Sequence, residues 1–216
     1  MRCWRASRRP KRNCHDFAVN IRAICVFCGS QPGRRRDYVA AARDTARLLA
    51  QGGIELVYGG GHVGLMGALA DEALRHGGRV TGVIPEHLMR PEVAHQRLTE
   101  LIVVDSMHTR KQTMALRSDA FIVLPGGFGT IEEMFEMLTW LQLRLQDKPV
   151  GLLNVAGYFD SLIEFLEHAA GEGLIRREHR DLLQVEHTPQ RLLDRLTAHL
   201  RASRTVHPAD GDISLT

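Results

Sequence analysis

Six short, nearly continuous apolar runs rich in valine and isoleucine recur along the chain. They predict strands, each buried on both faces, at 22–28, 54–58, 79–84, 101–104, 120–124 and 149–153. Between them, apolar residues recur every three or four positions, which predicts helices at 37–51, 64–76, 107–117, 131–146, 158–170 and 189–201. This alternation predicts an α/β, Rossmann-like, doubly wound fold, a mainly parallel sheet with helices on both faces. Ligands of such folds bind beyond the carboxyl ends of the strands.

The composition, 44% hydrophobic and 25% charged over 216 residues, suffices for one core. We expect a single domain over 21–201, between an Arg-rich, disordered extension at 1–20 and a polar tail at 202–216. Six of the 28 basic residues lie in the first twelve positions, so the body is nearly neutral, which argues against nucleic-acid binding. Since no run of 18 apolar residues and no secretory signal is present, we expect a cytoplasmic protein that does not enter a membrane.

All four cysteines lie in the first 28 residues, whereas a disulfide framework would spread them along the chain. Cys25 and Cys28 form a CxxC, but three residues apart on a strand they point to opposite faces. No second pair completes a zinc site. The pattern favours buried, reduced thiols over a metal or redox site.

Three loops that follow predicted strands are rich in glycine, and each leads into a helix. They are Gly29–Ser30, Gly59–Gly61 and Pro125–Thr130. Glycine lets backbone amides approach an anion closely, and a helix N-terminus favours negative charge. Any one loop is equally well a tight turn, but several on one sheet edge favour a phosphate site.

Gly59, Gly61 and Gly64 also match GxGxxG, the fingerprint of dinucleotide binding. In a dinucleotide fold the next strand ends in an acid that binds the ribose hydroxyls. Here that strand ends in Ile84 and Pro85. A dehydrogenase is therefore disfavoured.

The most informative stretch, residues 107–133, is MHTRKQTMALRSDAFIVLPGGFGTIEE. If consecutive strands are neighbours, Arg110 and Lys111 reach the last glycine loop, where cations would face a phosphate site. Each residue also has a purely structural interpretation. Arg110 and Lys111 suit a solvated helix face, and Thr130 and Glu133 match a capping box, which the local pattern alone favours.

These residues resemble the Lonely Guy (LOG) family of cytokinin riboside 5′-monophosphate phosphoribohydrolases. The specific signature is PGGxGTxxE with an upstream Arg-Lys pair. The matching segments are YGGGHVGLMG (58–67), GVIPEHLM (82–89), MHTRK (107–111), SDAFIVLPGGFGTIEE (118–133) and KPVGLLNVAGYF (148–159).

The resemblance implies hydrolysis of the N-glycosidic bond of a purine nucleoside 5′-monophosphate, which gives free base and ribose 5-phosphate. It places the catalytic arginine on Arg110 and the catalytic glutamate on Glu133. It also implies homodimers or larger homo-oligomers and no metal or organic cofactor. AMP and N6-modified, cytokinin-type nucleotides both stay open as substrates. The implied substrate contacts are Glu92, Arg110, Lys111, Gly126, Gly127, Phe128, Gly129, Thr130, Ile131 and Glu132.

Bacterial members of this family have often been labelled possible lysine decarboxylases. A pyridoxal phosphate enzyme needs a lysine for its Schiff base, and the chain has only Lys11, Lys111 and Lys148. Lys11 lies in the extension, Lys148 precedes a proline at a strand start, and the resemblance assigns Lys111 to the nucleotide, so decarboxylation is disfavoured. The alternative is a non-catalytic nucleotide-binding protein of the same fold, which would need the glycine loops but neither Arg110 nor Glu133.

Overall fold

A computed structural model describes residues 21–90 and 94–206. In that part of the chain, seven strands form one wholly parallel sheet in the order β4-β3-β2-β1-β5-β6-β7. The strands are β1 (Ala23–Phe27), β2 (Glu55–Tyr58), β3 (Val80–Pro85), β4 (Glu100–Val104), β5 (Ala120–Val123), β6 (Val150–Leu153) and β7 (Leu183–Glu186). The predicted extension at 1–20 and most of the predicted tail at 202–216 lie outside the described residues.

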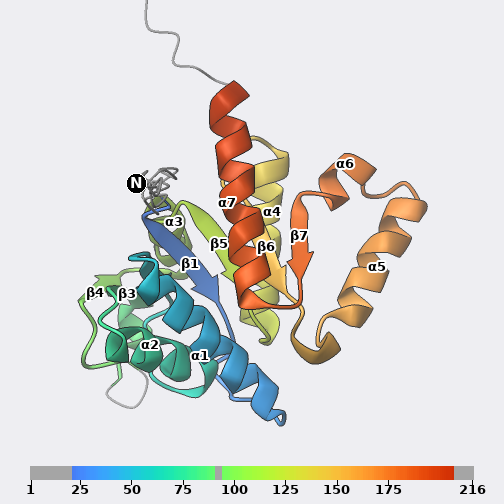
Figure 1. Cartoon of the computed structure of the whole chain (residues 1–216). Helices are drawn as coiled ribbons and strands as arrows, with labels where there is room; N and C mark the ends of the chain where they lie inside the picture. The colour runs from blue at the N-terminus through green and yellow to red at the C-terminus, as the bar shows by residue number, and fades with distance from the viewer. Residues whose placement is uncertain (1–20, 91–93, 207–216) are drawn as a thin grey trace, which may run out of the picture.

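Helices cover both faces of the sheet, which confirms the predicted fold class (Figure 1). Helices α1 (Arg36–Gln51), α2 (Gly64–Arg75) and α7 (Pro189–Val206) pack on one face. Helices α3 (Met107–Leu116), α4 (Phe128–Gln142) and α5 (Asp160–Gly171) pack on the other. Three short helical segments complete the described chain: η1 (Glu86–Leu88), η2 (Val155–Gly157) and α6 (Arg177–Arg180). Among the helices of the described ranges, none has the length and apolar content that a bilayer span requires.

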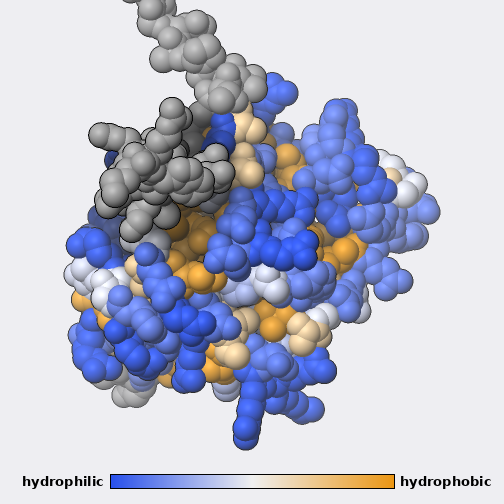
Figure 2. All heavy atoms as spheres, viewed as in Figure 1, coloured by the Kyte–Doolittle hydropathy of each residue, from blue (hydrophilic) through white to orange (hydrophobic). Residues whose placement is uncertain are grey.

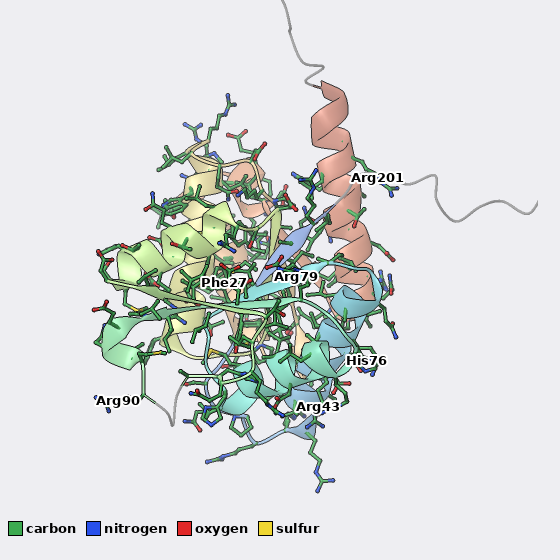
Figure 3. All side chains as sticks on the ribbon, turned by 90° about the vertical axis from the view of Figure 1, so that its left-hand side faces the viewer. Phe27, Arg43, His76, Arg79, Arg90 and Arg201 are labelled. Atoms are coloured by element: carbon green, nitrogen blue, oxygen red, sulfur yellow. The ribbon has the colours of Figure 1, made fainter. Side chains whose placement is uncertain are left out.

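Successive side chains of β1 point to opposite faces of the sheet and so enter two hydrophobic cores, one on each face. Ile24 and Val26 pack beneath α1, α2 and α7, whereas Cys25 and Phe27 pack beneath α3, α4 and α5. Cys28 lies on the side opposite Cys25, and both thiols are buried and free, as predicted. The view in Figure 2 shows a largely hydrophilic surface with apolar side chains exposed between the helices. In Figure 3 Phe27 lies in the interior, while labelled side chains such as Arg43 lie at the periphery.

Strand β7 was not predicted from the sequence. Its four residues, LQVE, mix apolar and polar side chains at the edge of the sheet, next to β6. Such a short strand lacks the continuous apolar run by which the other six strands are recognised.

Helix α4 differs from its prediction at both ends. It begins at Phe128 with Gly127 as N-cap, and no side chain caps it, so the capping box of Thr130 and Glu133 is wrong. Thr130 instead lies inside the first turn. The helix ends at Gln142, four residues early, and Arg144 adopts a left-handed backbone with φ of 57°.

The strand order creates a switch point between β1 and β5. From β1 the chain builds β2, β3 and β4 toward one edge, and then returns through α3 to β5 on the other side of β1. The loops that follow β1 and β5 therefore diverge, which opens a crevice at the carboxyl ends of these strands. The expectation that β4 and β5 are neighbours was wrong, because β3, β2 and β1 lie between them.

Gly64, part of the GxGxxG match, fixes the loop after β1 against the start of α2. Its φ is +62°, and a Cβ there would overlap the backbone carbonyl of Ser30. Gly53 has a similar φ of +66°, but nothing lies within 4 Å of the position of its Cβ. The pair therefore separates the cost of a left-handed backbone from the cost of steric overlap.

We predict that Gly53→Ala lowers the free energy of unfolding by roughly 1–2 kcal/mol, the cost of a left-handed alanine. Gly64→Ala is expected to cost about 1–3 kcal/mol more, because the Ser30 backbone must move. Urea unfolding followed by circular dichroism measures both. Equal losses in the two variants would show that the contact between Gly64 and Ser30 is not tight.

Candidate functional site

A pocket of about 500 Å³ opens at the carboxyl ends of the central strands. We call it the central pocket. The loops after β1, β2 and β5 contribute to its wall, together with side chains from α3 and α4, as a switch point predicts. Its wall comprises Val26, Phe27, Cys28, Gly29, Ser30, Gln31, Gly59, Gly61, Val63, Met66, Ile84, Leu88, Arg110, Met114, Gly127, Phe128, Gly129, Thr130 and Glu133.

Helix α4 presents free backbone donors to this pocket. Its first backbone hydrogen bond runs from Ile131 N to Gly127 O, at 3.1 Å, so the N–H groups from Gly127 to Thr130 have no backbone acceptor within the described chain. The positions of a Cβ at Gly127 and Gly129 are open space, and the Phe128 side chain is 96% exposed. An anion can therefore approach these amides closely.

Glu133 lies one turn beyond Thr130 on the same face of α4, since residues three apart on a helix are neighbours. Its side chain is buried in the pocket wall, with 9% exposed. Burial raises the pKa of Glu133 to about 7, although the positive charge of Arg110 opposes the rise. Near neutral pH both its protonated and ionised forms are populated. A carboxyl in this state is suited to chemistry on a bound molecule.

Arg110 extends from α3 across the ends of two strands. Its Nε donates to the carbonyl of Val83 on β3 at 3.0 Å, and its Nη2 donates to the carbonyl of Gly59 after β2, also at 3.0 Å. A Cβ at Gly59 would overlap Nη2, so only glycine leaves room for the guanidinium there. These bonds fix the orientation of the guanidinium and leave further N–H groups for a ligand.

Lys111 links α3 to α4. Its Nζ lies 2.5 Å from Glu132 Oε1 and 3.0 Å from Glu136 Oε2. Burial opposes the charge of Lys111, but its interactions with Glu132 and Glu136 outweigh this and raise its pKa. These ion pairs join the helix that carries Arg110 to the helix that carries Glu133.

The structure brings together six of the residues predicted for the site. Arg110, Gly127, Phe128, Gly129, Thr130 and Glu133 all line the central pocket. Lys111, Gly126, Ile131 and Glu132 adjoin its wall without forming part of it. Glu92 lies outside the described residues. The predicted adjacency of β4 and β5 does not bring Arg110 to this loop, because these strands are not neighbours. Arg110 reaches it from α3, through which the chain returns across the sheet.

Several wall residues were not predicted as site residues. Cys28, Met66, Ile84 and Met114 give the pocket an apolar side. These residues follow the same periodicity as core residues, so the sequence pattern gave no indication that they line a pocket. Burial, followed by the nearby charge of Glu133, raises the pKa of the Cys28 thiol well above its usual range, so this group stays protonated.

Comparisons with known proteins identify relatives of this chain. A family model described as "Possible lysine decarboxylase" matches residues 66–196. A probable cytokinin riboside 5′-monophosphate phosphoribohydrolase of Oryza sativa subsp. japonica is 50% identical, over 83% of this chain and 85% of the relative. A cytokinin riboside 5′-monophosphate phosphoribohydrolase of Arabidopsis thaliana is 48% identical over 82% of each protein.

Solved structures with the same fold are more distant in sequence. The molybdenum cofactor binding protein of Rippkaea orientalis superposes with a TM-score of 0.63 at 20% identity, covering 84% of this chain and 98% of that one. The Moco carrier protein of Chlamydomonas reinhardtii gives 0.61 at 21% identity, covering 85% and 99%. At this identity the likeness shows the fold alone. The family match and the closely similar phosphoribohydrolases together show that the chain belongs to the Lonely Guy (LOG) family.

Proposed function

We propose that this protein hydrolyses the N-glycosidic bond of a purine nucleoside 5′-monophosphate and releases the free base and ribose 5-phosphate. The relatives named above are phosphoribohydrolases of a cytokinin riboside 5′-monophosphate. The observation that carries the proposal is the arrangement of α4. Its free N–H groups and the buried carboxyl of Glu133 line one pocket, together with the guanidinium of Arg110, which two hydrogen bonds hold in place.

The N-terminus of α4 is the proposed site of the 5′-phosphate. The amides of Gly127, Gly129 and Thr130 supply donors, and the helix dipole favours the negative charge. Because the phosphate does not react, its binding serves to hold the sugar in the reactive orientation. One turn further along the helix, Glu133 then lies beside the ribose.

Glu133 and Arg110 are the proposed catalytic residues. As the bond from C1′ to the base nitrogen breaks, positive charge develops on the ribose ring and the electron pair leaves with the base. The ionised Glu133 stabilises this charge and orients the water whose oxygen bonds to C1′. The proton that this water loses balances the proton that the departing base nitrogen takes up, so the products are ribose 5-phosphate and the neutral base. Arg110 clamps the nucleotide and assists the departing base.

The remaining substrate contacts stay predictions from the resemblance. They are Glu92, Lys111, Gly126, Ile131 and Glu132. For Lys111 we propose an indirect contribution, because its ion pairs hold α3 and α4 together at the pocket.

A pyridoxal phosphate decarboxylase fits the central pocket poorly. Lys111 is held between two carboxylates, and the Nζ of Lys148 donates to the carbonyl of Ala115 at 2.6 Å. No lysine of the described chain lines the central pocket. Within the described residues, no lysine amine is therefore available to form a Schiff base in the pocket where the other reactive groups lie.

We predict that Glu133→Gln lowers turnover about 10²-fold or more, since it removes a charge that stabilises the transition state. Free base is measured by chromatography after incubation with AMP and, separately, with isopentenyladenosine 5′-monophosphate. Glu164→Gln, an exposed position on α5, is the matched control and should behave as wild type. Near wild-type turnover by Glu133→Gln would refute its catalytic assignment. A wild-type protein that binds either nucleotide and leaves it intact would instead be the non-catalytic binder.

The pH dependence of kcat/KM follows from the same carboxyl. If ionised Glu133 is the active form, the rate rises with pH to a plateau, with an apparent pKa of about 7. Because the negative charge of Glu132 contributes to the raised pKa of Glu133, Glu132→Gln should move the rising limb of this pH profile to lower pH. The substrate phosphate titrates near pH 6, but its pKa would not shift in this variant. A limb near 4.5, or one that Glu132→Gln leaves in place, would contradict the assignment.

We further propose that the protein is a homodimer. An apolar patch covers the ends of α3 and α4, where Leu116 is 75% and Leu145 69% exposed beside Trp140. Exposed apolar side chains that cluster in this way are typical of an interface.

Light scattering after size exclusion is expected to give about twice the chain mass of 24.2 kDa. Leu116→Asp should shift the protein toward the monomer, because it would bury a charge at the interface. Leu174→Asp, at a position that is 85% exposed after α5, is the control and should not change the mass. A monomeric wild type, or a dimer that survives Leu116→Asp, would rule out this interface.

A further inference from the structure

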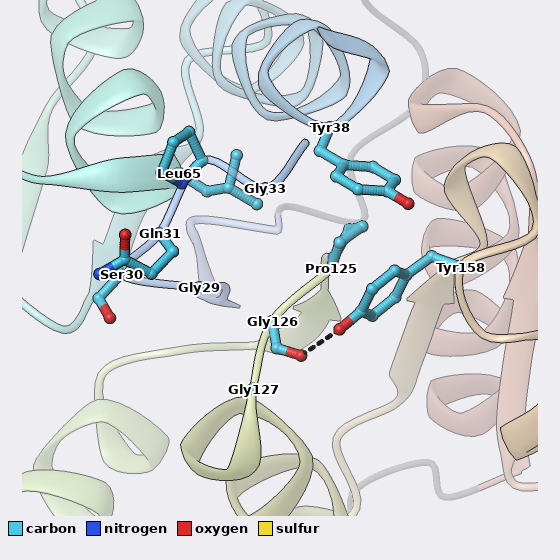
Figure 4. A pocket seen from close by; sticks show the side chains of 11 residues that line it. Gly29, Ser30, Gln31, Gly33, Tyr38, Leu65, Pro125, Gly126, Gly127 and Tyr158 are labelled. Atoms are coloured by element: carbon cyan, nitrogen blue, oxygen red, sulfur yellow. Dashed lines mark hydrogen bonds between the residues drawn. The ribbon is translucent and has the colours of Figure 1, made fainter. Parts of the chain in front are cut away.

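Tyr158 lies in the NVAGYF segment, to which the proposed function assigns no role. Its hydroxyl donates a hydrogen bond to the carbonyl oxygen of Gly126, at 2.7 Å (Figure 4). Tyr158 and Gly126 line a second pocket of about 250 Å³, which adjoins the central pocket. Gly127 lines both pockets, so the peptide between Gly126 and Gly127 forms part of the partition between them.

The bond from Tyr158 determines where the Gly127 N–H points. A peptide group is planar and trans, so its C=O and its N–H point in opposite directions. With the Gly126 oxygen directed at Tyr158 in the second pocket, the Gly127 N–H is directed to the other side, toward the central pocket. This N–H is the first of the free donors at the start of α4.

This peptide needs an external constraint because glycine flanks it on both sides. Glycine rotates freely about φ and ψ, so a peptide between two glycines can turn over at little cost. A side chain at Gly126 would overlap Thr130 Oγ1, which excludes a more restricted residue there. At Gly127 the position of a Cβ is open space, so a neighbour does not exclude other residues there. The hydroxyl of Tyr158 supplies the missing restraint.

Tyr158 is itself held firmly. Its ring packs edge-on against Phe159, at 4.8 Å between centroids, and against Tyr38, at 5.4 Å. Ala156, two residues before Tyr158, has a left-handed backbone with φ of 50°. Its carbonyl accepts a hydrogen bond from Arg35 Nη1 at 2.8 Å. A strained alanine persists only where its surroundings fix the backbone. Although the Tyr158 side chain is 41% exposed, these contacts orient its hydroxyl toward Gly126.

We propose that Tyr158 is a positioning residue, which holds the Gly126–Gly127 peptide so that the Gly127 N–H faces the 5′-phosphate of the substrate. The inference rests on the proposed function, since it presumes that the phosphate lies at the N-terminus of α4. Tyr158 does not touch the substrate. Its effect is confined to the phosphate end of the ligand, because the peptide it holds lies there.

The test is calorimetric binding of the two products, ribose 5-phosphate and adenine, to wild type, Tyr158→Phe and Tyr38→Phe. Tyr158→Phe keeps the ring packing and removes only the hydroxyl. We expect about 5-fold weaker binding of ribose 5-phosphate, the effect of losing one neutral hydrogen bond, and unchanged binding of adenine. Tyr38→Phe makes the same chemical change in the same pocket and should bind both products as wild type does.

Equal affinity of Tyr158→Phe and Tyr38→Phe for ribose 5-phosphate would overturn the inference. An equal loss of affinity for ribose 5-phosphate and adenine would also overturn it, because that result indicates a general distortion of the site. Hydrolysis by wild type in either case would leave the proposed function standing. If wild type neither hydrolyses a nucleotide nor binds ribose 5-phosphate, the proposed function fails, and this inference fails with it.

Discussion

The uncapped start of helix α4 is the constraint on which the rest of the site depends. Backbone N–H groups at a helix start must be satisfied by a cap, by water or by a ligand. Here the N-cap is Gly127, which has no side chain to satisfy them. The same helix carries Glu133 into the pocket wall and packs Met134 and Met137 into the core. A rigid, well-packed helix therefore fixes the separation between the donors that hold a phosphate and the carboxyl that acts on the sugar.

Burial of the Glu133 carboxyl lowers the free energy of unfolding at neutral pH. A carboxyl whose pKa is raised on folding favours the folded state less as the pH rises, because the native form holds a proton that the unfolded chain has released. For Glu133 this penalty is absent below its ordinary pKa of 4.5, grows as the pH rises through about 7, and reaches roughly 3 kcal/mol above that. Lys111 limits the accumulation of negative charge nearby, since it pairs with both Glu132 and Glu136.

Strands β1 to β6 could be predicted from the sequence, because they depend on short-range patterns. Continuous apolar runs identified β1 to β6, and the glycine loops that follow β1, β2 and β5 identified the edge of the sheet at which the pocket lies. Arg110 and Glu133 were instead predicted from the resemblance to a known family, since their local pattern favoured a helix surface and a capping box. Features set by tertiary contacts could not be predicted. Thr130 looks like an N-cap locally, but the helix already begins at Phe128 with Gly127 as its N-cap, and Thr130 is buried inside the first turn. The restraint from Tyr158 joins residues 32 positions apart, so it has no local pattern at all.

The most direct test of this account is a crystal structure of the protein with ribose 5-phosphate. The account predicts that the phosphate oxygens lie within hydrogen-bonding distance of the amides from Gly127 to Thr130, with the Glu133 carboxylate beside C1′ of the sugar. A phosphate bound elsewhere, or a sugar turned away from Glu133, would contradict the claim that helix α4 both anchors the nucleotide and delivers the catalytic carboxylate.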